Sequence, residues 1–277
     1  MGLRIQTNTS AAGVQRNLRV NTQSHDASLE KLSSGSRINK AADDAAGLSV
    51  SEGIRADIRS SRQGIRNGQD GISMVQTAEG ALSEISSNLI RLRELSIQSA
   101  SDTIGNPERG MLDMEAQQII TEIERIAHAT EHNGTKMLDV HSQVLQVQMG
   151  IHNNPDADRI YMDNQVGNST ISRLGVDSVH MRTKAAAHEN LSKVDRAIDQ
   201  VSKNRASLGA MSNRLQSGIN DLMSFTENLS AGHSRIKDVD LAHESSEMMR
   251  TKLLTESGTS LLTQANHSGN LVLKLLG

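Results

Sequence analysis

The stretch with the clearest potential for chemistry is HATEH, from His128 to His132, which has the His-x-x-Glu-His order of one class of zinc peptidases. On a helix this order would place two imidazoles about one turn apart beside a carboxylate, an arrangement that can bind zinc. However, Asn133 and Gly134 follow directly and favour the end of a helix. The sequence offers no obvious third ligand on a downstream helix. We therefore interpret the two histidines as a solvent-facing helix end, where imidazole favours the negative pole of the helix dipole.

Other catalytic patterns do not stand out in the sequence. The other eight of the ten histidines are scattered, the serines lack a nucleophile-elbow context, and no glycine-rich loop lies between a strand and a helix to hold a phosphate. Cysteine is absent, which excludes disulfides and thiolate metal sites. The sequence predicts no catalytic residue, no metal site and no cofactor. A peptidase built on HATEH stays the enzymatic alternative, and elemental analysis for zinc would distinguish it.

Charge and hydropathy exclude further classes. No run approaches the roughly 20 apolar residues of a membrane span, and the first residues lack the basic and apolar regions of a signal peptide. The first 40 positions contain six basic residues and two acidic residues. These charges are scattered and no aromatic residue lies there to stack on bases, so nucleic acid is not an expected partner. If the protein leaves the cytosol, it uses another route than this kind of leader.

The dominant pattern in the chain is an apolar heptad repeat. One Phe, one Tyr and no Trp are present, so the interior must be aliphatic. Helical seams run through residues 64–92, 112–130 and 191–229, and the last continues for more than five heptads. In the first seam, glycines at 64, 68 and 71 predict a close approach of another segment. Three long helices should therefore pack on one another.

Alternating residues between Leu145 and Met149, a turn at HNNPDAD and the segment RIYMD predict a β-hairpin on one flank of these helices. The two ends of the chain carry weaker helical seams, which cannot offset the entropy of ordering the chain alone. They need each other or a partner chain. The seam positions expected to make these contacts are Val14, Leu18, Leu29, Leu254, Leu261, Val272 and Leu275.

The stretch LSSGSRINKAADDAAGL, residues 32–48, resembles the most distinctive motif of bacterial flagellins. Three further segments resemble the terminal regions of that family in the same order. They are RIQTNTSAAGVQRNL at the start, residues 67–100, and the ending from SRIKDVD to LVLKLL. The resemblance covers nearly the whole chain. At the centre, where longer members carry outer domains, only residues 139–184 are present, so the resemblance implies a short flagellin without outer domains.

The resemblance implies a mainly α fold: a long antiparallel coiled-coil rod with a small β-hairpin, plus paired N- and C-terminal helices. It implies that residues 1–45 and 235–277 form inner-tube helices with a spoke, and that 46–234 form the rod, with the hairpin region at about 139–184. Asp43 or Asp44 is placed to cap the long helix that follows. The spoke residues carried over from the family are Ser33, Ser34, Gly35, Arg37, Asn39, Asp43 and Asp44.

By the same resemblance, the expected function is that of a structural subunit, not an enzyme, that polymerises into the flagellar filament for swimming. The implied partners are copies of the chain, other flagellins, the flagellar export apparatus and its chaperone, and the filament cap and hook-associated proteins. In many members an innate-immune receptor reads a face that corresponds to Arg91, Leu95 and Glu115. The implied location is the secreted filament, and the sequence leaves open whether it is naked, sheathed or periplasmic.

Two other function classes stay open at this point. A hook-associated junction protein would resemble flagellin at both ends, but those relatives usually carry proline at the position of Ala45. A cytoplasmic coiled-coil module would account for the heptads but not for the terminal motifs. The filament subunit is the interpretation that the sequence favours.

Overall fold

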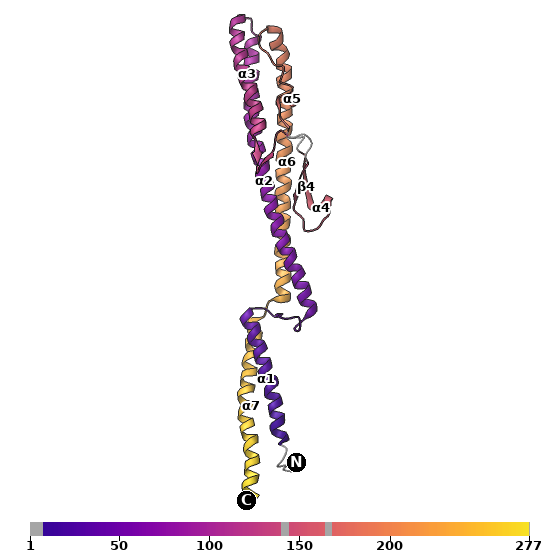
Figure 1. Cartoon of the computed structure of the whole chain (residues 1–277), viewed down its shortest axis with the longest axis vertical. Coiled ribbons are helices and arrows are strands. Elements are labelled where there is room, and N and C mark those ends of the chain that lie inside the picture. Colours follow the sequence, from indigo (N-terminus) through magenta and orange to yellow (C-terminus); the bar gives the residue numbers. More distant parts are fainter. Residues whose placement is uncertain (1–7, 140–143, 164–167, 277) are drawn as a thin grey trace. The chain divides into compact units, whose positions relative to one another are not determined.

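The computed structural model describes residues 8–139, 144–163 and 168–276 and confirms a mainly α fold (Figure 1). Two small antiparallel strand pairs accompany the helices. Within the described residues, no helix has both the length and the apolar character that crossing a membrane would require. The helices are α1 (Thr9–Ser34), α2 (Ala45–Ala100), α3 (Asn106–Ala129), α4 (Pro155–Asp158), α5 (Ile171–Leu174), α6 (Lys184–Lys237) and α7 (Leu241–Leu276). The strands are β1 (Glu131–His132), β2 (Thr135–Lys136), β3 (Val144–Gln148) and β4 (Arg159–Asp163).

The chain divides into two compact units, which are described separately. The terminal unit consists of residues 1–56 and 228–277, and the central unit consists of residues 57–227. Both boundaries fall inside long helices, α2 and α6, and not at helix ends.

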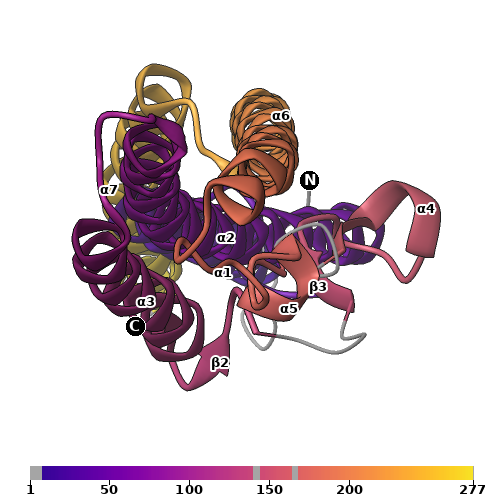
Figure 2. The same ribbon diagram turned by 90° about the horizontal axis from the view of Figure 1, so that it is seen from above.

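In the central unit α2, α3 and α6 lie side by side around one core (Figure 2). The core is aliphatic, as the composition predicts, and each of the three seams supplies buried residues. Leu82, Leu89, Ile123 and Leu215 are each fully buried.

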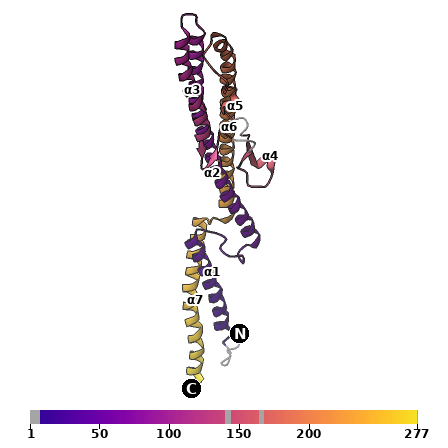
Figure 3. The same cartoon turned by 45° about the horizontal axis from the view of Figure 1, so that its top comes forward.

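The predicted hairpin is present as β3 and β4, which pair antiparallel with Val147 opposite Ile160. Figure 3 shows α4 and β4 on the α6 side of the central unit. Val147 and Met149 are buried, whereas Gln148 between them is half-buried and Gln146 before them is exposed, so the alternation in the sequence marks the inner face correctly. Residues 140–143 and 164–167 of the expected hairpin region lie outside the described residues.

The glycines of the α2 seam lie under this hairpin. A Cβ atom on Gly64 would lie 2.0 Å from the carbonyl oxygen of Met149, and one on Gly68 would lie 2.9 Å from Ile219. A Cβ on Gly71 would meet Val147 at 3.2 Å. The expected close approach is confirmed, and the approaching segments are the hairpin and α6.

A buried carboxylate fastens the connector between α5 and α6 to α3. Asp113 is 2% exposed, and it accepts hydrogen bonds from Met181 N at 2.7 Å and from Arg182 Nε at 2.8 Å. Burial alone would raise the pKa of Asp113, but these two donors outweigh it and hold the pKa below its ordinary value. The connector therefore depends on an ionised group inside the unit.

In the terminal unit α1 and α7 pack antiparallel (Figure 1). Asn8 near the start of α1 donates to the carbonyl oxygen of Ala265, and Lys31 near its end lies 3.9 Å from Glu244. Among the described side chains of this helix pair, Ala11 is the buried apolar one, and the other buried residues are Ser28, Glu244 and Thr251. The described part of the pair therefore has no core of large apolar residues.

We predict that Gly64→Ala destabilises the central unit by about 1–3 kcal/mol, because the added methyl group overlaps the rigid Met149 carbonyl. Chemical unfolding of the full-length protein measures the change. Gly80→Ala is the matched control, since Gly80 is exposed on the same helix with nothing near its Cβ position, and it should stabilise by up to about 1 kcal/mol. Equal effects of the two substitutions would contradict the close contact.

We also predict that Asp113→Asn lowers stability at neutral pH by about 1–3 kcal/mol, because Arg182 loses its carboxylate. The lowered pKa of Asp113 means that its contribution is present above the unfolded pKa of about 4 and is lost as the pH falls through the folded value. The difference between variant and wild type should therefore shrink in acid. Asp195→Asn, in an exposed pair with Arg93, should change little. A difference that does not vary with pH would rule out this account.

Candidate functional site

The segment between α1 and α2 is the first part of the candidate site. Gly35 ends α1 in the left-handed region with φ of 68°, and the hydroxyl of Ser34 accepts from the N–H of Ser36. Ser33 and Ser34, expected in a non-helical spoke, are the last two residues of α1. The correction has a local reason, because the Ser34 hydroxyl also bonds back to Lys31 O and so completes the last turn. The non-helical connector therefore spans residues 35–44.

This connector pairs with the segment that joins α6 to α7. Arg37 N donates to Lys237 O at 2.6 Å, and Val239 N donates to Gly35 O at 3.1 Å. The guanidinium of Arg37 also donates to Ile236 O at 2.8 Å, at the carboxyl end of α6. Two segments nearly 200 positions apart are thereby held together by backbone hydrogen bonds.

Two aspartates and one isoleucine shape the rest of the connector. Asp44 caps α2 by accepting from Gly47 N at 2.9 Å, whereas Asp43 accepts from the N–H groups of Asn39 and Lys40. These two backbone donors, Lys40 first, lower the pKa of Asp43. Ile38, the one large apolar side chain in the stretch, is 2% exposed. The polar connector thus has a single buried anchor.

The seam residues of α1 and α7 divide into two groups. Val14 and Leu18 are half-buried, and Leu18 Cδ1 lies 3.1 Å from the Cβ position of Gly258 on α7. By contrast Leu29, Leu254 and Leu261 are exposed, at 49%, 40% and 55%. The side chains of Val272 and Leu275 lie outside the described ones. Other large apolar residues that the seam did not single out are also exposed on these helices: Val20, Leu241, Met249 and Leu253.

The expected receptor face is corrected at one position. Arg91 and Glu115 are exposed and paired, with Nη2 of the arginine 2.7 Å from Oε1 of the glutamate. The guanidinium of Arg91 donates to Glu115 and to Glu94, and these hydrogen bonds, that to Glu115 first, raise the pKa of Arg91. Leu95, however, is 1% exposed and belongs to the core between α2 and its neighbours. Leu95 lies three residues after Leu92, which is also fully buried, so both belong to the inward face of α2.

The HATEH stretch does not lie on one helix. α3 ends at Ala129, and Glu131 and His132 belong to β1, so the motif spacing does not bring its groups to one helical face. His128 instead lies between two other carboxylates, 2.6 Å from Asp139 and 2.9 Å from Glu124. Its hydrogen bond to Asp139 first, and that to Glu124 second, raise the pKa of His128. Across the described residues no group of three or more His, Asp or Glu side chains is arranged to hold a metal ion.

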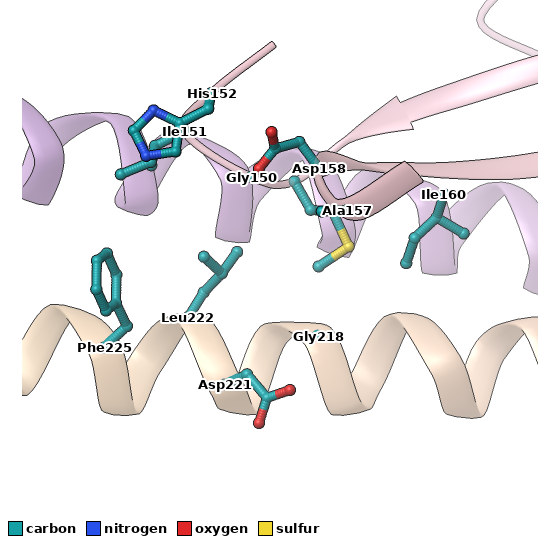
Figure 4. A pocket seen from close by; sticks show the side chains of 11 residues that line it. Gly150, Ile151, His152, Ala157, Asp158, Ile160, Gly218, Asp221, Leu222 and Phe225 are labelled. Atoms are coloured by element: carbon teal, nitrogen blue, oxygen red, sulfur yellow. The ribbon is translucent and has the colours of Figure 1, made fainter. Parts of the chain in front are cut away.

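A groove of about 330 Å³ lies between the β3–β4 hairpin and α6 (Figure 4). Leu222 and Phe225 point from α6 toward the loop that carries Gly150 and His152, while Asp221 points away from it. The carboxylate of Asp158 accepts a hydrogen bond from the backbone N–H of Asn154. The groove therefore offers mainly apolar packing surface and not a set of reacting groups.

Comparison with known proteins agrees with this arrangement. Residues 5–143 match the bacterial flagellin N-terminal helical region, and residues 191–276 match the bacterial flagellin C-terminal helical region. A flagellin of Halalkalibacterium halodurans is 41% identical over 279 residues, which cover 98% of this chain and 99% of that protein. The flagellar filament 33 kDa core protein of Treponema phagedenis is 38% identical, with the same coverage.

A solved structure is similar as well. The crystal structure of Bacillus cereus flagellin superposes with a TM-score of 0.51 at 28% identity, and the match covers 61% of this chain and 94% of that one. The two flagellin family regions, residues 5–143 and 191–276, include both terminal helices and the connector described above. The chain belongs to the bacterial flagellin family.

Proposed function

We propose that this chain is a structural subunit that polymerises into a bacterial flagellar filament used for swimming, and that its terminal helices make the polymerisation contacts. The observation that carries the proposal is the ring of exposed apolar side chains around α7. The proposed role is structural and requires neither a catalytic residue nor a cofactor. Family membership supports it, because the relatives compared above are a flagellin and a flagellar filament core protein.

The directions of the α7 side chains favour a lattice over a dimer. Thr251 faces α1 and is 3% exposed. At about 100° per residue, Leu254 and Leu261 lie roughly 60–80° to one side of it, whereas Met249 and Leu253 lie roughly 160° away, on the back of the helix. A two-fold dimer covers one patch per chain. Apolar residues on a flank and on the back need at least two further neighbours, as in a helical polymer.

The energetics of the terminal unit support the same proposal. Its inner seam buries small and polar residues such as Ser28 and Thr251, so packing α1 on α7 supplies little of the free energy that ordering two long helices requires. Full burial of a leucine contributes about 1.5–3 kcal/mol, and these leucines are about half exposed, so covering each by neighbouring subunits would contribute about half of that. We infer that the terminal helices gain most of their stability on assembly.

In this proposal residues 1–45 and 235–277 form the inner tube and its spoke, and residues 46–234 form the next layer. The hairpin region, at about 139–184, takes the place of an outer domain. The partners are further copies of the chain, other flagellins, the export apparatus with its chaperone, and the cap and hook-associated proteins. The filament lies outside the cytoplasm, either exposed, sheathed or in the periplasm.

We further propose that an innate-immune receptor contacts the α2–α3 face at Arg91 and Glu115. Both side chains are exposed and hold each other in place across the two helices. Leu95 would act indirectly, by fixing the packing of α2 beneath Arg91, because its own side chain is buried. Recognition requires a monomer or filament that is accessible from outside the cell.

The polymerisation test uses Leu261→Ala and Leu253→Ala, one on the flank and one on the back of α7. Each should raise the critical monomer concentration for seeded polymerisation about 4- to 13-fold, because each loses roughly 0.8–1.5 kcal/mol of burial gained on assembly. Both leucines are more than half exposed in the single chain, so monomer unfolding should not change. Sedimentation of filaments against concentration measures the effect.

Lys252→Ala, an exposed polar neighbour of Leu253, is the control and should polymerise normally. If only one of the two leucine variants is impaired, the lattice geometry proposed for α7 is wrong. If wild-type protein stays monomeric with filament seeds and precipitating salt, the proposed function itself fails.

For the receptor, Arg91→Ala should reduce activation of receptor-expressing cells by purified monomer by about tenfold or more, as expected for a central interface arginine. Arg93→Ala is the matched control. It removes a similar exposed arginine from the other side of α2, where its partner is Asp195. Equal loss with both variants, or none with Arg91→Ala, would contradict the proposed contact.

A further inference from the structure

The sequence contains two Asn-Gly dipeptides, Asn67-Gly68 and Asn133-Gly134, in very different surroundings. Asparagine followed by glycine is prone to intramolecular cyclisation, because no Cβ on the following residue hinders attack on the asparagine side chain. Whether the reaction proceeds in a folded protein depends on the freedom of the side-chain amide and of the following backbone N–H. The structure separates the two dipeptides on both counts.

Asn133 lies at the exposed tip of the hairpin formed by β1 and β2. Its carboxamide has no hydrogen-bond partner among the residues that the structure describes. Gly134, also exposed, has nothing within 4 Å of its Cβ position, and its N–H lies between the paired residues and donates to no described group. Asn133 has a φ of 49°, so the turn already holds a backbone conformation that is rare for a residue with a side chain.

Little structure has to open for this turn to move. The hairpin has only two residue pairs, Glu131 with Lys136 and His132 with Thr135. Two-stranded hairpins of this size are marginal, and exposed loop tips open with free energies close to zero. Both reacting groups of Asn133-Gly134 can therefore reach the geometry for cyclisation without unfolding the central unit.

Asn67-Gly68 is held on every side. Asn67 Nδ2 donates to Gln148 O at 2.8 Å, and its Oδ1 accepts from Gln63 Nε2 at 2.9 Å. Gly68 is buried inside α2, where its N–H belongs to the helical ladder, and a Cβ there would lie 2.9 Å from Ile219. Reaction at this dipeptide requires α2 to open beneath the β3–β4 hairpin.

We propose that Asn133 is a site of spontaneous deamidation in the folded protein and that Asn67 is protected by the fold. The Gly134 nitrogen, after giving up its proton to base, attacks Cγ of Asn133. The N–Cγ bond forms, the Cγ–Nδ2 bond breaks, and ammonia leaves a cyclic succinimide. Water then opens either carbonyl of the ring to give aspartate or isoaspartate. Water is the one co-reactant and ammonia the one by-product.

The products change the hairpin in two ways. Either product places a new carboxylate near Glu131, which is already paired with Lys136 at 3.0 Å. Isoaspartate also lengthens the backbone by one carbon, so the two-residue turn cannot keep its register. Lys136 donates to His128 O, and Met137 N donates to Thr130 O, so the change is transmitted to the end of α3.

The test is peptide mapping by mass spectrometry of the full-length protein after incubation in mildly alkaline, ammonia-free buffer. In native protein we expect deamidation at Asn133 to be at least about tenfold faster than at Asn67, because the latter needs local opening of a buried helix. In denaturant the two rates should approach each other, since both dipeptides then lack structure. Asn133→Gln should abolish the signal at that peptide, and Asn67→Gln should leave the rate at Asn133 unchanged.

Native rates that are equal, or faster at Asn67, would overturn the proposal. A ratio that is the same in native and denatured protein would also overturn it, because flanking sequence and not the fold would then set the difference. Loss of the difference on denaturation supports it.

Discussion

The close contact between the backbone of α2 and the β3–β4 hairpin is the constraint on which the central unit depends. With almost no aromatic side chains available, the core cannot be filled by a few large groups, and its elements must approach one another closely instead. Gly64 allows the Met149 carbonyl to rest on the helix, and Gly68 and Gly71 admit Ile219 and Val147 beside it. The hairpin therefore packs against both α2 and α6 and is an integral part of the central unit.

The packing of the terminal unit differs from that of the central unit. Its described helices leave large apolar residues such as Leu253 and Leu261 exposed, keep Val14 and Leu18 half-buried, and enclose alanine, serine, threonine and one glutamate. We propose that such a unit gains most of its stability when neighbouring subunits cover this surface, whereas the central unit packs around its own aliphatic core.

Much of this division can be predicted from sequence. Heptad spacing locates the three long helices, and alternation at 144–149 locates a strand with its correct inner face, because these periods reflect burial directly. The terminal seams are less informative: the sequence cannot separate Leu18, which contacts α7, from Leu254 and Leu261, which lie outside. A position that packs on a helix of the same chain and a position proposed to pack on a neighbouring subunit are both apolar. The spacing alone therefore does not distinguish them. Asp113 is also not recognisable as a buried residue, because its two donors come from a connector without periodicity.

The pairing of the two connectors has a mechanical consequence. Residues 35–44 and 238–240 join α1 and α7 covalently to α2 and α6, and so act as tethers when the two terminal helices are under tension. Val239 N donates to Gly35 O and joins the two tethers, and Arg37 N donates to Lys237 O at the end of α6. When one terminal helix is pulled harder than the other, part of the force on it passes through these hydrogen bonds as shear. Both connecting segments then share that force. Since backbone groups make two of the three bonds, this load sharing does not depend on the identity of most side chains in the connector.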